Sequence, residues 1–543
     1  MKILPDIKSP ADVKRLSESS IEPLCSELRE AIIGAVSQTG GHLASNLGAV
    51  ELTVALHRVY DSERDRMVFD VGHQCYAHKM LTGRLDRFGG LRRMDGLSGF
   101  PKPCESVSDA CVAGHASTSI SNALGMARAR TIQGADYDVV AVIGDGALTG
   151  GLAYEGLADC GESGEAIVIV LNDNGMSINS NVGGMARLLS AQRVKPSYIA
   201  IKRFYHRTIG RVEPVYRVLH VVKEWIKDLF LPDNMFEDMG FYYLGPVDGH
   251  DEKTLERTLR YARDMRRPVL LHIKTEKGRG YAPAEAEPEK YHGVSPFDPR
   301  TGVALSKKHD FSAVFGQELL RLAKEDGRIV AVTAAMESGT GLHDFASALP
   351  ARFFDVGIAE EHAVSMCAGM AQQGLKPVFA VYSSFLQRAY DMLIHDVSLS
   401  GLPVVLGVDR AGLVGADGET HQGVFDVCFL SSVPGMRIFA PSSFAETRTM
   451  LREALDGSSP AAVRYPRGGE GLFRGDRSSG REAVMRPGAD VTIVGYGILI
   501  NEALYAADEL EKANISAEVI KLNRLDGDDF TLCLRSIERT GRL

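Results

Sequence analysis

The sequence contains no CxxC pair, because its eight cysteines stand singly between Cys25 and Cys533. Zinc sites and thioredoxin-like redox sites usually place two cysteines two residues apart, so both kinds of site are excluded in their usual form. Single cysteines without such partners are most often reduced and buried. We therefore expect the thiols of this chain to be reduced and mostly buried.

Long apolar runs are also missing. No stretch has the length and hydrophobicity of a transmembrane helix, and residues 1–16 (MKILPDIKSPADVKRL) lack the apolar region and cleavage site of a secretory signal. We therefore expect a cytoplasmic protein with no membrane partner. The formal net charge of −9 argues against a general nucleic-acid binder.

Internal repeats and low-complexity tracts are absent too, and 543 residues are too many for a single core. Short β-branched runs alternate with helical segments over residues 1–290 and again over residues 311–480. The region between them, residues 291–310, indicates a linker, and residues 481–543 begin a third unit. The predicted fold class is α/β, with two doubly wound parallel-sheet domains plus a partial third α/β domain.

The most informative pattern is a pair of apolar runs that each end in polar residues. The run Val139–Ile143 has the length and β-branched content of a buried parallel strand, and a glycine turn containing Asp145 follows it. A second run, Ala166–Leu171, is followed by Asn174. If the two strands are close, both oxygen ligands emerge at one sheet edge, where they suit Mg²⁺ and a diphosphate.

Further polar turns precede predicted helices, and they contain His42, His73 with His78, and His115. A single loop histidine is more often a hydrogen-bonded surface residue than a catalytic one. Several of these polar turns follow an apolar segment and precede a predicted helix. This repeated arrangement favours one shared ligand-binding edge of a sheet over unrelated surface loops.

Residues 183–228 are locally basic. The charge is typical of a solvated segment over the site, since no aromatic interleaving accompanies it as in nucleic-acid binders. An apolar stripe from Val218 to Leu229 is more typical of packing on a core or subunit than on a membrane.

The second domain offers a carboxylate, Glu360, at a predicted strand-to-helix turn. Alone, it is best explained as a helix-start carboxylate that interacts with the helix dipole. Together with a metal and diphosphate turn, it favours thiamine diphosphate, because a buried glutamate can hydrogen-bond the aminopyrimidine ring. The other polar candidates at this sheet edge include arginines, which suit phosphate or carboxylate. They are Tyr382, Arg388, Arg410, Asp417, His421 and Arg467.

Motifs between about residue 40 and 470 resemble those of the 1-deoxy-D-xylulose-5-phosphate synthase family of transketolase-like thiamine enzymes. They include GGHLASNLG, DVGHQ, GHASTSIS, IGDGALTGG, LNDNGMSI, FDVGIAEEHAV and YSSFLQRAYD. GDG alone indicates only some thiamine enzyme. The block GADGETHQG at 415–423 is much more specific.

The resemblance implies synthesis of 1-deoxy-D-xylulose 5-phosphate and CO₂ from pyruvate and D-glyceraldehyde 3-phosphate by a homodimer. This is the first step of non-mevalonate isoprenoid precursor biosynthesis and also feeds thiamine and pyridoxal synthesis. The implied cofactors are thiamine diphosphate and Mg²⁺, the latter bound by Asp145, Asn174 and the carbonyl of Met176. The implied cofactor contacts are His73, Gly114, His115, Ala116, Gly144, Asp145, Gly146, Ala147, Asn174, Met176, Glu360, Phe385 and Arg388. The implied catalytic residues are Glu360, His42, His421, His73 and His292. The implied substrate contacts are His42, Tyr382, Arg388, Arg410, Asp417, His421 and Arg467.

The sequence departs from the family pattern at two places. Glu361 stands where the family commonly has glutamine, which adds a charge beside the ring-binding Glu360. The third domain is shorter than in the family, and we expect this to affect folding stability or dimer contacts before chemistry. Two alternatives stay open: another thiamine enzyme such as transketolase, and an inactive paralogue that acts as a binding subunit.

Overall fold

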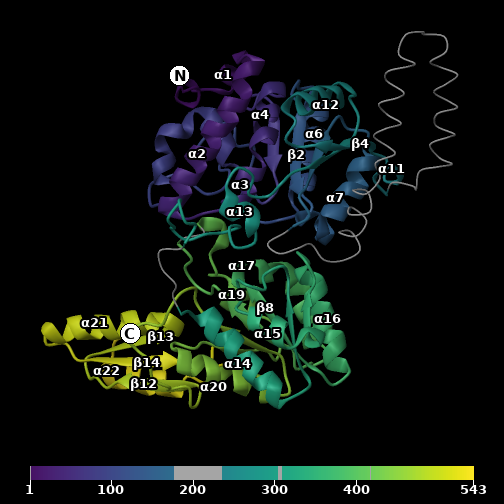
Figure 1. The fold of residues 1–543 in the computed structure, drawn as a ribbon. Helices are drawn as coiled ribbons and strands as arrows, with labels where there is room; N and C mark the ends of the chain where they lie inside the picture. The colour runs from purple at the N-terminus through teal and green to yellow at the C-terminus, as the bar shows by residue number, and fades with distance from the viewer. Residues whose placement is uncertain (1, 177–234, 304–308, 416–417) are drawn as a thin grey trace, which may run out of the picture. The chain divides into compact units, whose positions relative to one another are not determined.

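The computed structural model describes residues 2–176, 235–303, 309–415 and 418–543 (Figure 1). The chain forms two compact units, unit 1 from Met1 to Leu305 and unit 2 from Ser306 to Leu543. The basic segment predicted to lie over the site falls outside the described residues. Within the described ranges, none of the helices combines the length and apolarity that a bilayer span needs.

The described part of unit 1 is built on a five-stranded parallel sheet with the order β1-β2-β3-β5-β4. Its strands are β1 (Arg66–Phe69), β2 (Val139–Gly144), β3 (Val168–Asp173), β4 (Tyr242–Asp248) and β5 (Val269–Lys274). The inner strands β2, β3 and β5 are runs of valine, isoleucine and leucine that are buried on both faces. Such runs form the centre of parallel sheets because helices cover both sides.

Helices of unit 1 cover the two faces of this sheet. On one face, α4 (Val50–Val59) and α12 (Glu252–Asp264) share a core with Val140 of β2. On the other, α6 (Ser119–Gln133) contacts β1 and β2 and packs beside α7 (Gly151–Glu162). The other helices of the described part are α1 (Pro10–Arg15), α2 (Ile21–Thr39), α3 (Ala44–Gly48), α5 (Tyr76–Lys79), α11 (Met235–Asp238) and α13 (Ala282–Ala286).

Residues 291–303 of the predicted linker pack on unit 1. Gly41 and Val294 exchange two backbone hydrogen bonds of 2.9 and 2.8 Å, and the amide of Phe297 donates to the carbonyl of Ser37 at 3.0 Å. These bonds bring His292 to the turn that follows α2. The domain limits at 290, 310 and 480 stay predictions.

The described part of unit 2 contains a six-stranded sheet with the order β10-β11-β9-β8-β6-β7, all parallel. Its strands are β6 (Ile329–Thr333), β7 (Phe353–Asp355), β8 (Lys376–Tyr382), β9 (Val405–Asp409), β10 (Arg437–Phe439) and β11 (Ala461–Arg464). One face shares a core with α14 (Phe311–Glu325) and α20 (Phe444–Asp456), and the other with α16 (Glu360–Gln372). The shorter helices are α15 (His343–Ala348), α17 (Ser383–Leu386), α18 (Tyr390–Met392) and α19 (Asp426–Ser431).

A smaller mixed sheet follows in unit 2. Strand β14 (Ala517–Leu522) pairs in parallel with β13 (Val491–Tyr496) and antiparallel with β12 (Glu482–Arg486). The apolar runs DVTIVGYG and AEVIKL predict two strands and residues 501–513 predict a helix, and the structure forms β13, β14 and the helix α21 (Ile500–Lys512) there. The sequence pattern does not predict β12 or α22 (Thr531–Thr540). The family comparisons below confirm the α/β fold class of this third part.

A buried polar network in unit 1 joins α4 to the loop after α5. The ring of His57 is 3.0 Å from that of His78, which is 3.0 Å from the carboxylate of Asp109. Arg84 donates two bonds of 2.8 Å to the same carboxylate. Burial lowers the pKa of both rings below 6.5, for His57 well below it and for His78 against the opposing effect of Asp109.

We expect the free energy of unfolding to fall as the pH drops below about 6.5. Below this pH the unfolded chain binds protons on His57 and His78 that the folded chain does not bind. Each ring lowers the stability by at most about 1.4 kcal/mol per pH unit until its own folded pKa is reached. Urea unfolding between pH 8 and 5 measures the slope. His57→Gln should make the slope shallower, and an identical slope in variant and parent would contradict the prediction.

Candidate active site

Three histidine rings of unit 1 lie together although their segments are far apart in the sequence. His42 follows α2, His73 follows β1, and His292 lies in the segment that packs on the α2 turn. The ring centroids are 5.4 Å apart for His42 and His73, 5.6 Å for His42 and His292, and 5.2 Å for His73 and His292. The rings are therefore close enough to contact one small molecule.

Burial keeps two of these rings uncharged. It lowers the pKa of His73 to about 3, and the ammonium of Lys277 acts in the same direction. It lowers the pKa of His292 well below the usual value, helped by Lys277 and by the two neighbouring rings. Among the described residues, none makes a hydrogen bond to Nδ1 of His73. A neutral imidazole with an available nitrogen suits hydrogen bonding and proton transfer.

Lys277 is a charged residue of this site that the sequence interpretation missed. It follows β5 by three residues and is 7% exposed. Burial lowers its pKa to about 8, against the opposing effect of the carboxylates of Asp145 and Glu289. Its place just after a parallel strand was the available signal, because ligands bind at that edge of α/β sheets.

Side-chain hydrogen bonds hold the turn before α6 against Asp70, which follows β1, and against the turn after β2. The buried carboxylate of Asp70 accepts from the amides of Ser117 and Ser119 at 2.8 and 3.0 Å. The hydroxyl of Ser117, whose φ of 72° lies in the left-handed region, donates to the carbonyl of Ala147 at 2.7 Å. The predicted Gly114, His115 and Ala116 belong to this turn, so it is fixed beside Ala147.

Asp145 and Asn174 lie at one edge of the sheet. Strands β2 and β3 are neighbours, and Gly144 is in register with Asn172. The carboxylate of Asp145, which is 2% exposed, accepts from the amide of Gly175 at 2.7 Å. The side-chain oxygen of Asn174 accepts from the amide of Met176 at 3.1 Å.

This loop offers a fitting set of ligands for Mg²⁺ and phosphate. A carboxylate, a side-chain amide and a backbone carbonyl, from Asp145, Asn174 and Met176, are all oxygen donors of the kind that Mg²⁺ prefers. A Cβ placed on Gly144 would meet no atom of a described residue within 4 Å, so the described part of the chain leaves space beside the turn. Gly146 and Ala147 continue the same turn.

In unit 2, Glu360 begins α16 and is 2% exposed. Burial raises its pKa to about 7; the guanidinium of Arg388 opposes this shift and the carboxylate of Glu361 adds to it. Arg388 is 3.7 Å from Oε2, an oxygen that no described residue reaches with a hydrogen bond. A carboxyl group that is buried and protonated in part near neutral pH is suited to exchange a hydrogen bond with a ring nitrogen.

An aromatic cluster in unit 2 collects further predicted residues. The rings of Tyr382 and Phe385 are stacked at 5.6 Å, and His421 meets Phe385 edge-on at 5.4 Å. The guanidinium of Arg410 lies 3.7 Å from the centre of the Tyr382 ring. Arg410 also donates to the carbonyl of Gly339 at 3.0 Å, which fixes its direction.

The remaining predicted residues of unit 2 are Arg467 and Asp417. Arg467 is exposed on the loop after β11. Asp417 lies outside the described residues. The flanking loop is closed by Gln422, whose side chain exchanges hydrogen bonds of 2.6 and 3.3 Å with the backbone of Val414.

Comparisons with known proteins agree with this arrangement. A family model described as 1-deoxy-D-xylulose-5-phosphate synthase matches residues 4–275. Models of the transketolase pyrimidine-binding and C-terminal domains match residues 307–469 and 480–543. A 1-deoxy-D-xylulose-5-phosphate synthase of Heliobacterium modesticaldum is 48% identical, over 100% of this chain and 86% of its own length. Synthases of Clostridium kluyveri (48%; 95% and 84%) and Clostridium tetani (49%; 94% and 84%) are similarly close.

The chain belongs to the 1-deoxy-D-xylulose-5-phosphate synthase family. The match confirms the predicted family and, with the two transketolase domains, the predicted fold class.

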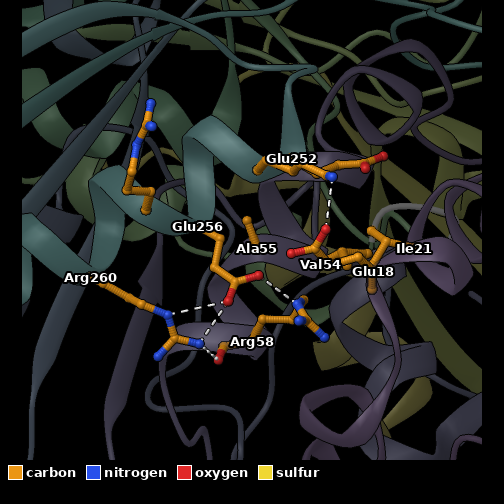
Figure 2. Close-up of a pocket in the computed structure, with 10 residues that line it drawn as sticks. Glu18, Ile21, Val54, Ala55, Arg58, Glu252, Glu256 and Arg260 are labelled. Atoms are coloured by element: carbon orange, nitrogen blue, oxygen red, sulfur yellow. Dashed lines mark hydrogen bonds and ion pairs between the residues drawn. The ribbon is translucent and has the colours of Figure 1, made fainter.

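A pocket of about 320 Å³ in this synthase-family chain lies apart from all the predicted residues. It is lined by charged residues of α4, α12 and the segment before α2, and Figure 2 shows Glu256 paired with both Arg58 and Arg260. Those ion pairs measure 2.6 and 2.8 Å, and Lys253 lies 2.8 Å from Glu18. Because these charged side chains are already paired with one another, we assign no ligand to this pocket.

Nearby, Cys25, Glu51 and Glu252 are spaced closely enough to hold a metal ion. The carboxylate of Glu51, however, already accepts from Arg29 at 2.6 Å and lies 3.0 Å from a ring nitrogen of His250. Burial also raises the pKa of the Cys25 thiol, whereas metals bind the thiolate. The cluster is therefore better explained as a buried ion pair.

Glu361, the departure from the family pattern, gives a testable effect on its neighbour. Glu361→Gln removes a negative charge that raises the pKa of Glu360, so that pKa should move down from about 7 but stay above its ordinary value because burial remains. Infrared titration of the glutamate carboxyl band in the apo protein measures the midpoint, with Glu360→Gln identifying the band. Glu337→Gln is the control, since that carboxylate acts on Asp355 instead. An unmoved midpoint in Glu361→Gln, or equal movement in the control, would refute the effect.

Proposed function

We propose how the residues of this chain carry out the reaction of its family. The chain is a transketolase-type transferase that uses thiamine diphosphate to form 1-deoxy-D-xylulose 5-phosphate and CO₂ from pyruvate and D-glyceraldehyde 3-phosphate. This reaction is the first step of non-mevalonate isoprenoid precursor biosynthesis. One observation carries the assignment: a chain 48% identical to such synthases over its whole length has a histidine cluster and an oxygen-ligand turn at the edge of a parallel sheet.

We propose Asp145, Asn174 and the carbonyl of Met176 as the ligands of Mg²⁺. The adjacent glycine turn and the turn before α6 would bind the diphosphate, through Gly114, His115, Ala116, Gly144, Gly146 and Ala147. The support is the oxygen donor set and the space that the described residues leave beside Gly144. Lys277 joins these residues as a nearby positive charge.

When bound, thiamine diphosphate supplies a nucleophilic carbon and an electron sink for decarboxylation. Glu360 would hydrogen-bond the aminopyrimidine through Oε2, an oxygen without a hydrogen bond from any described residue. Its pKa of about 7 lets it hold or release a proton near neutral pH. Phe385 and Arg388 would contact the cofactor beside it, and Arg388 keeps the carboxyl partly ionised.

The histidine cluster would handle protons on the substrates. His42, with His73 and His292 beside it, would hold a proton at a ring nitrogen and transfer it as pyruvate loses CO₂ and the aldehyde is attacked. Because His73 and His292 are buried and neutral, they add hydrogen bonds without attracting bulk water or a counter-ion. His421 would be the corresponding proton carrier in unit 2.

The acceptor aldehyde carries a phosphate, and the arginines of unit 2 would bind it. Arg410 is the best placed, because Gly339 and the Tyr382 ring hold its planar fork in one direction. Arg388, Arg467 and Asp417 complete the proposed substrate contacts with Tyr382 and His421.

We also propose a homodimer and a cytoplasmic location on family grounds. Sedimentation equilibrium of the purified protein tests the dimer, and a monomer at micromolar concentration would refute it.

The reaction is tested by mixing purified protein, thiamine diphosphate and Mg²⁺ with pyruvate, with and without D-glyceraldehyde 3-phosphate. The aldehyde should strongly raise CO₂ release, and the product should be a five-carbon ketose phosphate. His42→Ala should reduce turnover about 10²- to 10⁴-fold, the usual loss for one positioned proton-transfer group. The exposed His343→Ala is the matched control and should match the parent. A folded, cofactor-loaded sample with no turnover, or one that transfers ketol groups without CO₂, would refute the function.

The metal assignment has its own test. Asp145→Ala should abolish the Mg²⁺-dependent part of thiamine diphosphate binding, because the carboxylate is the only full negative charge in the proposed ligand set. Calorimetric titrations with Mg²⁺ and with chelator measure that part. The exposed Asp159→Ala, which breaks only an ion pair with Arg128, serves as the control. Unchanged Mg²⁺ dependence in Asp145→Ala would overturn the ligand assignment.

A further inference from the structure

A single asparagine connects the backbones of two histidines of the cluster. Asn46 lies on the short helix α3 and is 1% exposed. Its side-chain nitrogen donates to the carbonyl of His42 at 2.8 Å and to that of His73 at 2.6 Å. Its side-chain oxygen accepts from the amide of Tyr76 at 2.8 Å. Only one orientation of the amide satisfies all three bonds, because two acceptors face the nitrogen and one donor faces the oxygen.

Tyr76 closes this arrangement from the other side. Its buried hydroxyl accepts from the backbone amide of His42 at 3.2 Å. A Cβ on Gly41 would lie 2.7 Å from that hydroxyl, so the ring is packed directly against the histidine turn. The amide and the carbonyl of His42 are therefore both held, one by Tyr76 and the other by Asn46.

The helix α3 also reaches the third histidine. The hydroxyl of Ser45 is 3.4 Å from Nδ1 of His292. The backbone of Ala44 accepts from Gly278 at 2.9 Å and donates to Tyr291 at 2.9 Å, which ties the segments after β5 and before His292 to the same turn. The five-residue helix α3 thus contacts the segments that carry His42, His73, His292 and Lys277.

We propose that Asn46 is a positioning residue that sets the spacing of His42 and His73 for proton transfer, an inference that rests on the proposed function. The two histidines follow different elements, α2 and β1, and thirty residues of the chain lie between them. One donor group shared by both carbonyls converts two independent turns into a single rigid one. The reaction rate is sensitive to the positions of catalytic groups, since displacing one by about 1 Å can reduce the rate 10²-fold.

A matched pair of variants separates positioning from general stability. The control residue is Asn523, which lies in the C-terminal part of the chain and is also 1% exposed. Its side-chain nitrogen donates to the carbonyls of Arg477 and Gly480 at 2.8 and 3.1 Å. Asn46→Ala and Asn523→Ala should both lower the melting temperature. Only Asn46→Ala should lower kcat, by about 10- to 100-fold, with the KM of each substrate changed far less. Asn46→Ser, which retains one donor, should fall between the parent and Asn46→Ala and replaces it if that variant does not fold.

A second measurement does not depend on turnover. The histidine ring signals of the apo protein, recorded by NMR and assigned with His42→Ala and His73→Ala, should shift in Asn46→Ala and stay in place in Asn523→Ala. The proposal would be overturned if folded Asn46→Ala or Asn46→Ser kept the wild-type kcat and unshifted ring signals. It would also be overturned if Asn523→Ala lost as much kcat as Asn46→Ala. If His42→Ala itself keeps full turnover, the proton-transfer role proposed for His42 fails, while the ring signals still decide whether Asn46 positions the histidines.

Discussion

The pairing of β2 with β3 is the constraint on which the site of unit 1 depends. Because Gly144 is in register with Asn172, the two strands end together and their turns share one edge of the sheet. The amide of Asp145 donates to the carbonyl of Asn172, and the carboxylate of Asp145 accepts from Gly175. The two turns are therefore one hydrogen-bonded structure. The pairing of β1 with β2 brings His73 to the same edge.

Burial decides the charge of the ionisable groups proposed for the reaction in each of the two units. Removal from water disfavours the charged form of every ionisable group, so it lowers the pKa of His73 and Lys277 and raises that of Glu360. The result is a neutral imidazole and a carboxyl group that is partly protonated, both near neutral pH. Acid–base work at that pH requires groups in such states.

Much of the fold could be predicted from the sequence because its signals are local. A β-branched run followed by a glycine turn predicted β2 and placed Asp145 just after it, and a similar run placed Asn174. The spacing of apolar residues after His42 predicts one helix that starts near Ser45 or Asn46, but the structure divides it into α3 and α4, and β12 was missed altogether. Its sequence, EAVMR, has no run of β-branched residues, and it forms by pairing with β14.

The contacts that organise the histidine cluster leave no such local signal. Asn46 acts through backbone carbonyls of other segments, and Lys277 acts through its distance to rings that are remote in sequence. Periodicity reports which face of an element is buried, but it cannot report which side chain of another segment lies across from it.

The sequence by itself determined the parallel α/β class, the order of strands and polar turns, and the chemical groups that each turn carries, because these follow from local composition and spacing. Only the tertiary structure decided that the turns with His42, His73 and His292 meet, which groups are neutral there, and that Asn46 joins two of the turns. Those properties arise from strand register and from exclusion of water, which depend on contacts between residues far apart along the chain.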